Sequence, residues 1–161
     1  MRFAIVTYPT ILSALVAAVA GCSEGKHPFR MVQLCLTGPQ EIPAFTSFMN
    51  EIAQSYQMEF FDRSGQTHDE LQSLATVNKN TPVNARAINI GAERGSEFSF
   101  SAGNLGLPTN QIAIGFNGDD PNEAKAFSDV AVDRLSTKWR IHEVPQGSGA
   151  LPLRGCVRTL T

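Results

Sequence analysis

The segment 42–56 reads IPAFTSFMNEIAQSY and carries the clearest structural signal in the chain. Its apolar residues recur at spacings of three and four, so on a helix they form one continuous stripe. The stripe consists of Ile42, Phe45, Phe48, Met49, Ile52, Ala53 and Tyr56. Pro43 fits only in the first turn of such a helix, where backbone N–H groups are unpaired in any case. We therefore predict an amphipathic helix that packs its stripe against a second layer.

Strands are predicted on both sides of this helix. Residues 29–37 alternate between apolar and other side chains, which is typical of a strand with one buried face. Gly38-Pro39 ends that strand before the helix begins. Residues 58–61 follow the helix as a second short strand.

The rest of the chain repeats this alternation. The capping-box pattern of Thr67 and Glu70 predicts a short helix that ends near Ala75. Asp120 followed by Pro121 predicts the start of a second main helix. Further strands are predicted at 85–90, 97–101, 111–116 and 139–144, with a loop at 78–82, a turn at 91–95 and a packed tail at 146–161.

This order of elements predicts an α+β fold, a two-layer sandwich with two main helices on a mostly antiparallel sheet. The spacing is close to a ferredoxin-like βαββαβ unit with an added hairpin strand. We predict a single globular domain over residues 29–161.

The N-terminus has the layout of a secretory signal. Arg2 is followed by an apolar run at 11–18 and then by small residues that lead to Cys22. The apolar run is shorter than the roughly 20 residues of a spanning helix, which argues against a transmembrane anchor. A plain secretory signal with an accidental cysteine is the other alternative.

Val19-Ala20-Gly21-Cys22 resembles the lipobox of bacterial lipoproteins. The resemblance implies a signal peptide at 1–21, cleavage before Cys22, and acyl chains such as palmitate on that cysteine. Residues 22–28 are then a lipidated tether with a reach of about 20 Å. Because Ser23 rather than an aspartate follows the cysteine, the resemblance favours the outer membrane, with the protein facing the periplasm.

Charge and cysteine content agree with an envelope protein. The formal net charge is −2, without a basic cluster, which argues against a nucleic-acid partner. Cys35 and Cys156 remain as a pair in an oxidising compartment and are predicted to form a disulfide; two buried free thiols are the alternative. Since no CxxC motif occurs, thiol exchange is not expected.

Few residues form a pattern with chemical meaning. The carboxylates at 117–123 could hold calcium, but a turn and a helix cap explain every residue there. Asp62, Ser64 and His68 are the residue types of a nucleophilic site, although no G-x-S-x-G elbow occurs. The three histidines lack zinc-site spacing, and no cofactor motif is present, so we predict neither a metal nor a cofactor.

The loop at 103–110 is the candidate partner-binding site. Asn104, Leu105 and Leu107 would place two apolar side chains beside an amide on one loop. The alternative is that this loop folds back onto the core.

Together these observations favour a membrane-anchored, non-enzymatic protein-binding module of the bacterial envelope. It could be an inhibitor or immunity-type protein that occupies the site of a toxic enzyme. It could instead be an accessory subunit of an envelope assembly. A small hydrolase that uses Asp62, Ser64 and His68 is the third hypothesis.

Overall fold

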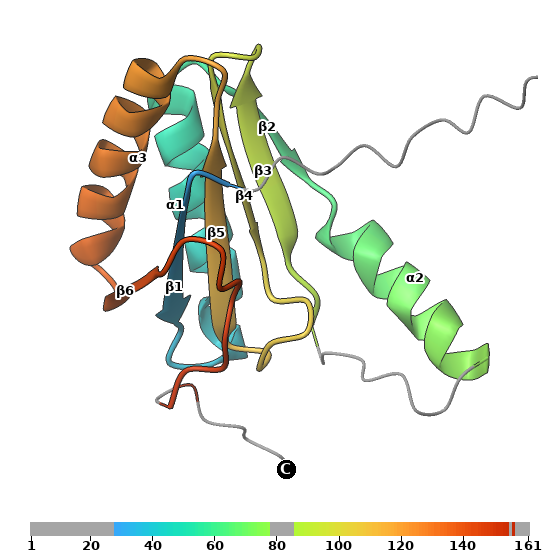
Figure 1. The fold of residues 1–161 in the computed structure, drawn as a ribbon. Coiled ribbons are helices and arrows are strands. Elements are labelled where there is room, and N and C mark those ends of the chain that lie inside the picture. The colour runs from blue at the N-terminus through green and yellow to red at the C-terminus, as the bar shows by residue number, and fades with distance from the viewer. Residues whose placement is uncertain (1–27, 78–85, 155, 157–161) are drawn as a thin grey trace, which may run out of the picture.

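A computed structural model describes residues 28–77, 86–154 and 156 (Figure 1). The predicted signal peptide at 1–21, the acylation site Cys22, nearly all of the tether and the loop at 78–82 lie outside these residues. Within the described part of the chain, no helix has both the length and the apolar character needed to cross a membrane.

Every described strand belongs to one sheet. The elements are β1 (Arg30–Cys35), the 3₁₀ turn η1 (Pro39–Glu41), α1 (Ile42–Ser55), β2 (Glu59–Asp62), α2 (Ser64–Val77), β3 (Asn89–Arg94), β4 (Phe98–Gly103), β5 (Gln111–Asn117), α3 (Pro121–Ser136) and β6 (Ile141–Val144). The strand order is β2-β3-β4-β5-β1-β6, and all neighbouring strands are antiparallel.

The predicted two-layer α+β sandwich is confirmed. β1–α1–β2 and β5–α3–β6 are the two strand–helix–strand units expected of a ferredoxin-like arrangement. The hairpin β3–β4 adds two strands between β2 and β5 in the sheet. α1 and α3 pack on the same face of the sheet (Figure 1).

An aromatic cluster fills the space between this face and the helices. Phe127 of α3 is fully buried, and its ring centroid lies 4.8 Å from that of Phe98 and 5.9 Å from that of Phe116. Tyr56, at the end of α1, meets Phe127 edge-on at 5.0 Å. Such stacked and edge-on pairs stabilise a core beyond the area that they bury, so Phe127 joins α3 to the sheet and to the end of α1.

The predicted caps and stripe are found for the two packed helices. The stripe of α1 is buried from Ile42 to Ala53, and Tyr56 is half-buried. The Asp120 carboxylate accepts hydrogen bonds from the backbone N–H groups of Asn122 and Glu123 at 2.9 and 3.1 Å. A turn and a helix cap therefore account for part of the acidic segment 117–123, as expected.

Two local predictions are wrong. α2 begins at Ser64, so Thr67 lies inside the helix rather than at its cap, and the helix has 14 residues rather than being short. β3 begins at Asn89 and contains Gly91, which was predicted to lie in the turn. Gly91 is needed within the strand because a Cβ there would lie 2.5 Å from the ring of Phe61 on β2.

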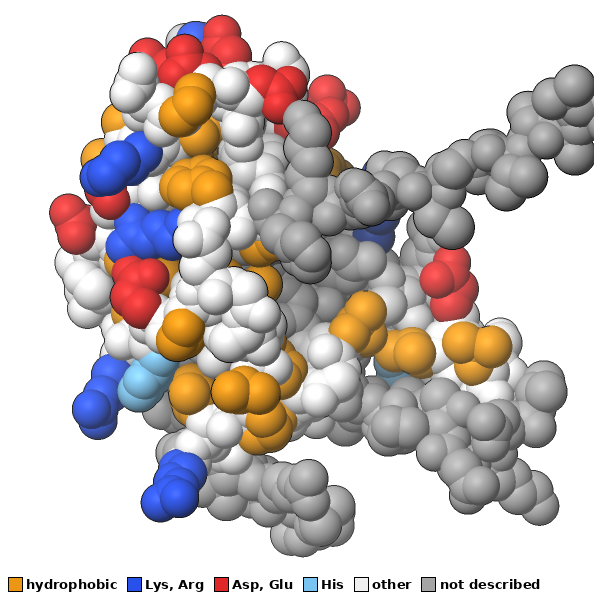
Figure 2. Space-filling view, viewed as in Figure 1, with side chains coloured by type: hydrophobic (Ala, Val, Ile, Leu, Met, Phe, Trp, Pro, Cys, Tyr) orange, Lys and Arg blue, Asp and Glu red, His pale blue; other side chains and the backbone are white. Residues whose placement is uncertain are grey.

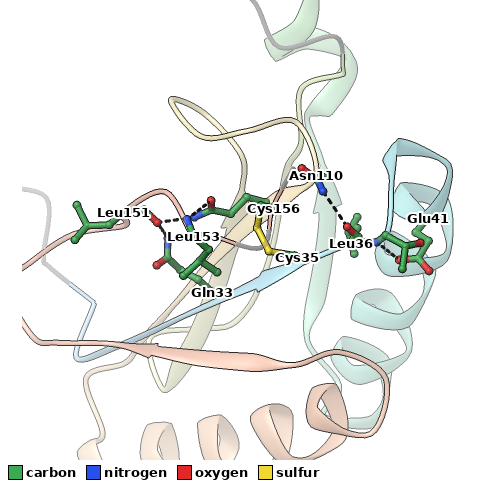
Figure 3. The surroundings of a disulfide bond; sticks show 10 residues. Gln33, Cys35, Leu36, Glu41, Asn110, Leu151, Leu153 and Cys156 are labelled. Atoms are coloured by element: carbon green, nitrogen blue, oxygen red, sulfur yellow. Dashed lines mark hydrogen bonds between the residues drawn. A yellow bond between two sulfur atoms is a disulfide. The ribbon is translucent and has the colours of Figure 1, made fainter. Parts of the chain in front are cut away.

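The C-terminal residues lie across the sheet face opposite the helices. We name residues 145–154 together with Cys156 the C-terminal strap (Figure 1). The predicted disulfide between Cys35 and Cys156 is present, with the two Cα atoms 5.4 Å apart (Figure 3). Gln33 and Gln111 are both buried, and each donates a side-chain hydrogen bond to the carbonyl of Leu151.

Candidate functional site

The sheet face opposite α1 and α3 is only partly covered, and we name it the open face. Side chains alternate along a strand, so the residues beside the buried Phe98 and Phe100 on β4 point to this face. Ser101 of β4 lies opposite Gly115 of β5 and is exposed, although both strands lie inside the sheet. The open face therefore has a floor of small residues at the centre of the sheet.

α2 forms one border of the open face. Asn89 of β3 holds the first turn of this helix: its backbone N–H donates to Ser64 Oγ at 3.0 Å, and its side-chain amide donates to Thr67 Oγ1 at 2.9 Å. Beyond that turn the helix extends away from the sheet (Figure 1). Leu74 lies on this outer part and is 57% exposed.

The C-terminal strap forms the opposite border. Its Leu151 is 59% exposed, although the backbone of the same residue accepts the bonds from Gln33 and Gln111. Figure 2 shows that the apolar side chains on this side of the molecule include some over the strap and some over α2. Single exposed apolar residues are ordinary on soluble proteins, but here they border an incompletely covered sheet face.

The N-terminal tether meets the same face. A Cβ on Gly115 would lie 3.2 Å from Pro28, so Pro28 packs directly over that glycine. The backbone N–H of Phe29 donates to the carbonyl of Phe116 at 3.1 Å, which fixes where the chain enters the sheet. The chain therefore enters the domain from the side of the open face.

The candidate nucleophile and base do not form a hydrogen-bonded pair. Ser64 Oγ accepts the N–H of Asn89, and Asp62 accepts the backbone N–H of Ser64 at 2.9 Å, so both serve the start of α2. His68 lies one turn further on, and its Nδ1 is buried with no hydrogen-bond partner among the described residues. These three residues are thus close in the fold but lack the contact between serine and imidazole that activates a nucleophile.

The predicted partner-binding loop is mostly turned inward. The side chain of Asn104 is fully buried, where its Oδ1 accepts the N–H of Ile88 and its amide donates to the carbonyls of Arg86 and Thr109. Leu107 is also buried, whereas Leu105 is 52% exposed. For Asn104 and Leu107 the alternative interpretation therefore holds, in which the loop packs back onto the core. Of the three predicted residues, Leu105 alone is exposed enough to contact a partner.

Ion pairs gather on the helix side of the sheet. Arg30 of β1 binds Asp129 of α3 and Glu143 of β6, and the hydrogen bond to Glu143 raises the pKa of Arg30. The pKa of Asp129 is lowered, mainly by its hydrogen bond from Lys125. These pairs join α3 to the edge of the sheet and are exposed enough that each contributes little to stability.

The described residues do not form a metal-binding site. No group of three His, Cys, Asp or Glu side chains there is arranged to hold an ion. The prediction of no metal remains a prediction for the chain as a whole.

No protein-family model, curated protein or solved structure is similar enough to this chain to count as a match. The surface formed by the open face and α2 was missed at the sequence level. The sequence pattern that could have indicated this surface is in α2, a mostly polar helix in which Leu71 and Leu74 are the large apolar residues before Ala75.

Proposed function

We propose that this chain is a lipid-anchored protein of the bacterial envelope that acts by binding another protein. The observation that carries the binding proposal is the position of α2. This helix is tied to β3 at its first turn, extends beside the incompletely covered open face, and leaves Leu74 more than half exposed. An apolar side chain on a protruding, firmly attached helix is suited to insertion into a pocket of a partner.

The envelope location has two supports. The first is the resemblance of residues 19–22 to a lipobox, which implies acyl chains on Cys22. The second is the disulfide between Cys35 and Cys156, because disulfides persist in oxidising compartments such as the periplasm.

The tether places the proposed binding surface near the bilayer. Pro28 lies over Gly115 on the open face, and only residues 23–27 separate it from Cys22. At about 3.3–3.6 Å per extended residue, this segment reaches about 20 Å. A partner that binds the open face or α2 must therefore share that membrane or approach along its surface.

This closeness favours an accessory subunit of an envelope assembly over an inhibitor of a freely diffusing enzyme. An immunity-type protein remains the second form of the proposal, because its target could itself be delivered to the membrane. Identity and stoichiometry of the captured partner distinguish the two.

The test is capture of partners by the tagged full chain from its own membranes. Leu74→Glu places a charge on the exposed part of α2 and should abolish capture. Val130→Glu is the matched control, since Val130 is 41% exposed on α3 at the helix side of the sheet. A stoichiometric partner retained by Val130→Glu and lost by Leu74→Glu supports the proposal, whereas equal capture by both variants contradicts it.

The hydrolase hypothesis has a separate test. Ser64→Ala removes the only hydroxyl among Asp62, Ser64 and His68, so it should abolish turnover of any substrate found for the chain if the hypothesis holds. Retained turnover in a folded variant would remove it.

A further inference from the structure

A second feature of the molecule lies at the far end of β1, under the C-terminal strap. Here a groove of about 470 Å³ is lined by Arg140, His142, Arg154, Leu153 and Cys35. It continues into a neighbouring hollow of about 360 Å³ that shares His142, Leu153 and Arg154. β1 runs from Arg30 to Cys35, so at about 3.3 Å per residue the groove lies roughly 17 Å from the point where the tether enters.

The sheet register places the positive side chains on one side of β6. His142 pairs with Gln33 across the β1–β6 ladder, so it points to the open face, and Arg140 precedes it by two residues. Glu143 points to the other face, where Arg30 binds its carboxylate. The one carboxylate of β6 is therefore turned away from the groove.

Arg140 and Arg154 have no acidic partner in the part of the chain that the structure describes. Within the described ranges neither guanidinium forms an ion pair, whereas Arg30, Arg94 and Lys125 all do. Figure 2 shows basic and histidine side chains beside apolar ones at the lower left of this side of the molecule. A chain with net charge −2 thus has a locally positive corner.

The strap holds Arg154 in position from both sides. On one side, the backbone N–H of Leu153 donates to Gln111 Oε1 at 2.9 Å. On the other side, Cys156 is bonded to Cys35 on β1 (Figure 3). The backbone that carries Arg154 is thereby preorganised, so less conformational freedom is lost when a ligand binds.

We propose that this groove binds an oxyanion, a phosphate or a carboxylate, carried on a short apolar group. Two guanidinium forks match the oxygens of either anion, and charge-assisted hydrogen bonds are the stronger kind. Leu153 and the disulfide supply an apolar wall for the attached group. The groove is lined by no residue of α2, on which the partner-binding proposal rests, so each proposal can fail without the other.

The test is isothermal titration of the purified full chain, in a non-ionic detergent, with hexyl phosphate, hexanoate and hexanol. At least one of the two anions should bind, and hexanol should bind at least about tenfold more weakly, because it lacks the charge. The tighter anion identifies the class of the natural ligand. Equal affinity for hexanol, or binding of neither anion, would overturn the proposal.

Arg140→Gln and Arg154→Gln should each weaken binding of the preferred anion by at least about tenfold. Arg86→Gln is the matched control, since Arg86 is also exposed but lies outside the groove. This variant should bind the preferred anion as tightly as the wild type does. Both groove arginines are exposed, so unfolding midpoints should stay the same in all three variants. Unchanged affinity in both groove variants, or an equal loss in Arg86→Gln, would assign any binding to another place.

Discussion

Removal of the disulfide should destabilise the fold strongly, because the bridge closes a very long loop. Cys35 and Cys156 are separated by 121 residues in sequence. In the chain-entropy model a loop of that length stabilises the folded state by roughly 5 kcal/mol. The disulfide also holds the strap where Gln33 and Gln111 donate hydrogen bonds to it. Each of these bonds contributes a net stabilisation of about 1 kcal/mol.

The assay is denaturant unfolding followed by the fluorescence of Trp139, whose ring packs edge-on against Phe45 and Phe48 at 5.6 and 5.5 Å. Cys35→Ala/Cys156→Ala is compared with its parent in a Cys22→Ala background, which removes the acylation site from both. That parent, Cys22→Ala alone, is in turn compared with the wild type, which controls for loss of a cysteine outside the bridge. The double variant should lose roughly 5–7 kcal/mol, from the loop closure together with the two hydrogen bonds, and reduction of the parent should reproduce that loss. A loss below about 1 kcal/mol, or no response to reductant, would show that the bridge does not stabilise the fold in this way.

Three further outcomes follow from the core and its loops. Phe127→Ala should cost about 3–5 kcal/mol of unfolding free energy by calorimetry, while Val130→Ala, on the exposed side of α3, should stay within about 0.5 kcal/mol. Asn104→Ala leaves the buried N–H of Ile88 without its partner and should cost about 1–3 kcal/mol in denaturant unfolding. The Thr37 N–H lowers the pKa of Glu41 below its ordinary 4.5, so Glu41→Gln should reduce stability at neutral pH. The difference in stability between Glu41→Gln and the wild type should narrow as the pH of the thermal melts falls through the lowered pKa of Glu41. A difference independent of pH would contradict a stabilising role for the ionised Glu41 carboxylate.

The two packed helices could be predicted because their local and tertiary signals agree. The stripe of α1 repeats with the helical period, and Asp120 with Pro121 is a strong start for α3. The disulfide could also be predicted, since two cysteines remained after Cys22 was assigned to lipid.

The start of α2 and the bounds of β3 could not be predicted, because long-range contacts set both. The N–H of Asn89 binds Ser64 from 25 residues away, which favours a helix start before the capping-box residue Thr67. Gly91 looks like a turn residue in sequence, yet it lies within a strand because the Phe61 ring occupies the space above it. In both cases tertiary contacts outweigh local preference.

The candidate sites show the same limit. Asn104 was predicted to belong to a partner-binding loop, but its amide satisfies three backbone groups in the interior. Arg140 and Arg154 are 14 positions apart, and only the disulfide and the glutamine contacts of the strap bring them to one groove. A surface formed by residues that are distant in sequence and joined by long-range contacts leaves no periodic pattern in the sequence.

The proposed function depends on contact between α2 and a protein partner at the membrane. The most direct measurement places a photo-crosslinking amino acid at Leu74 of the full chain in its own cells, and at Val130 in a parallel strain. After irradiation we expect one discrete protein adduct from position 74 and none from position 130. No adduct from position 74, or the same adducts from both positions, would contradict it.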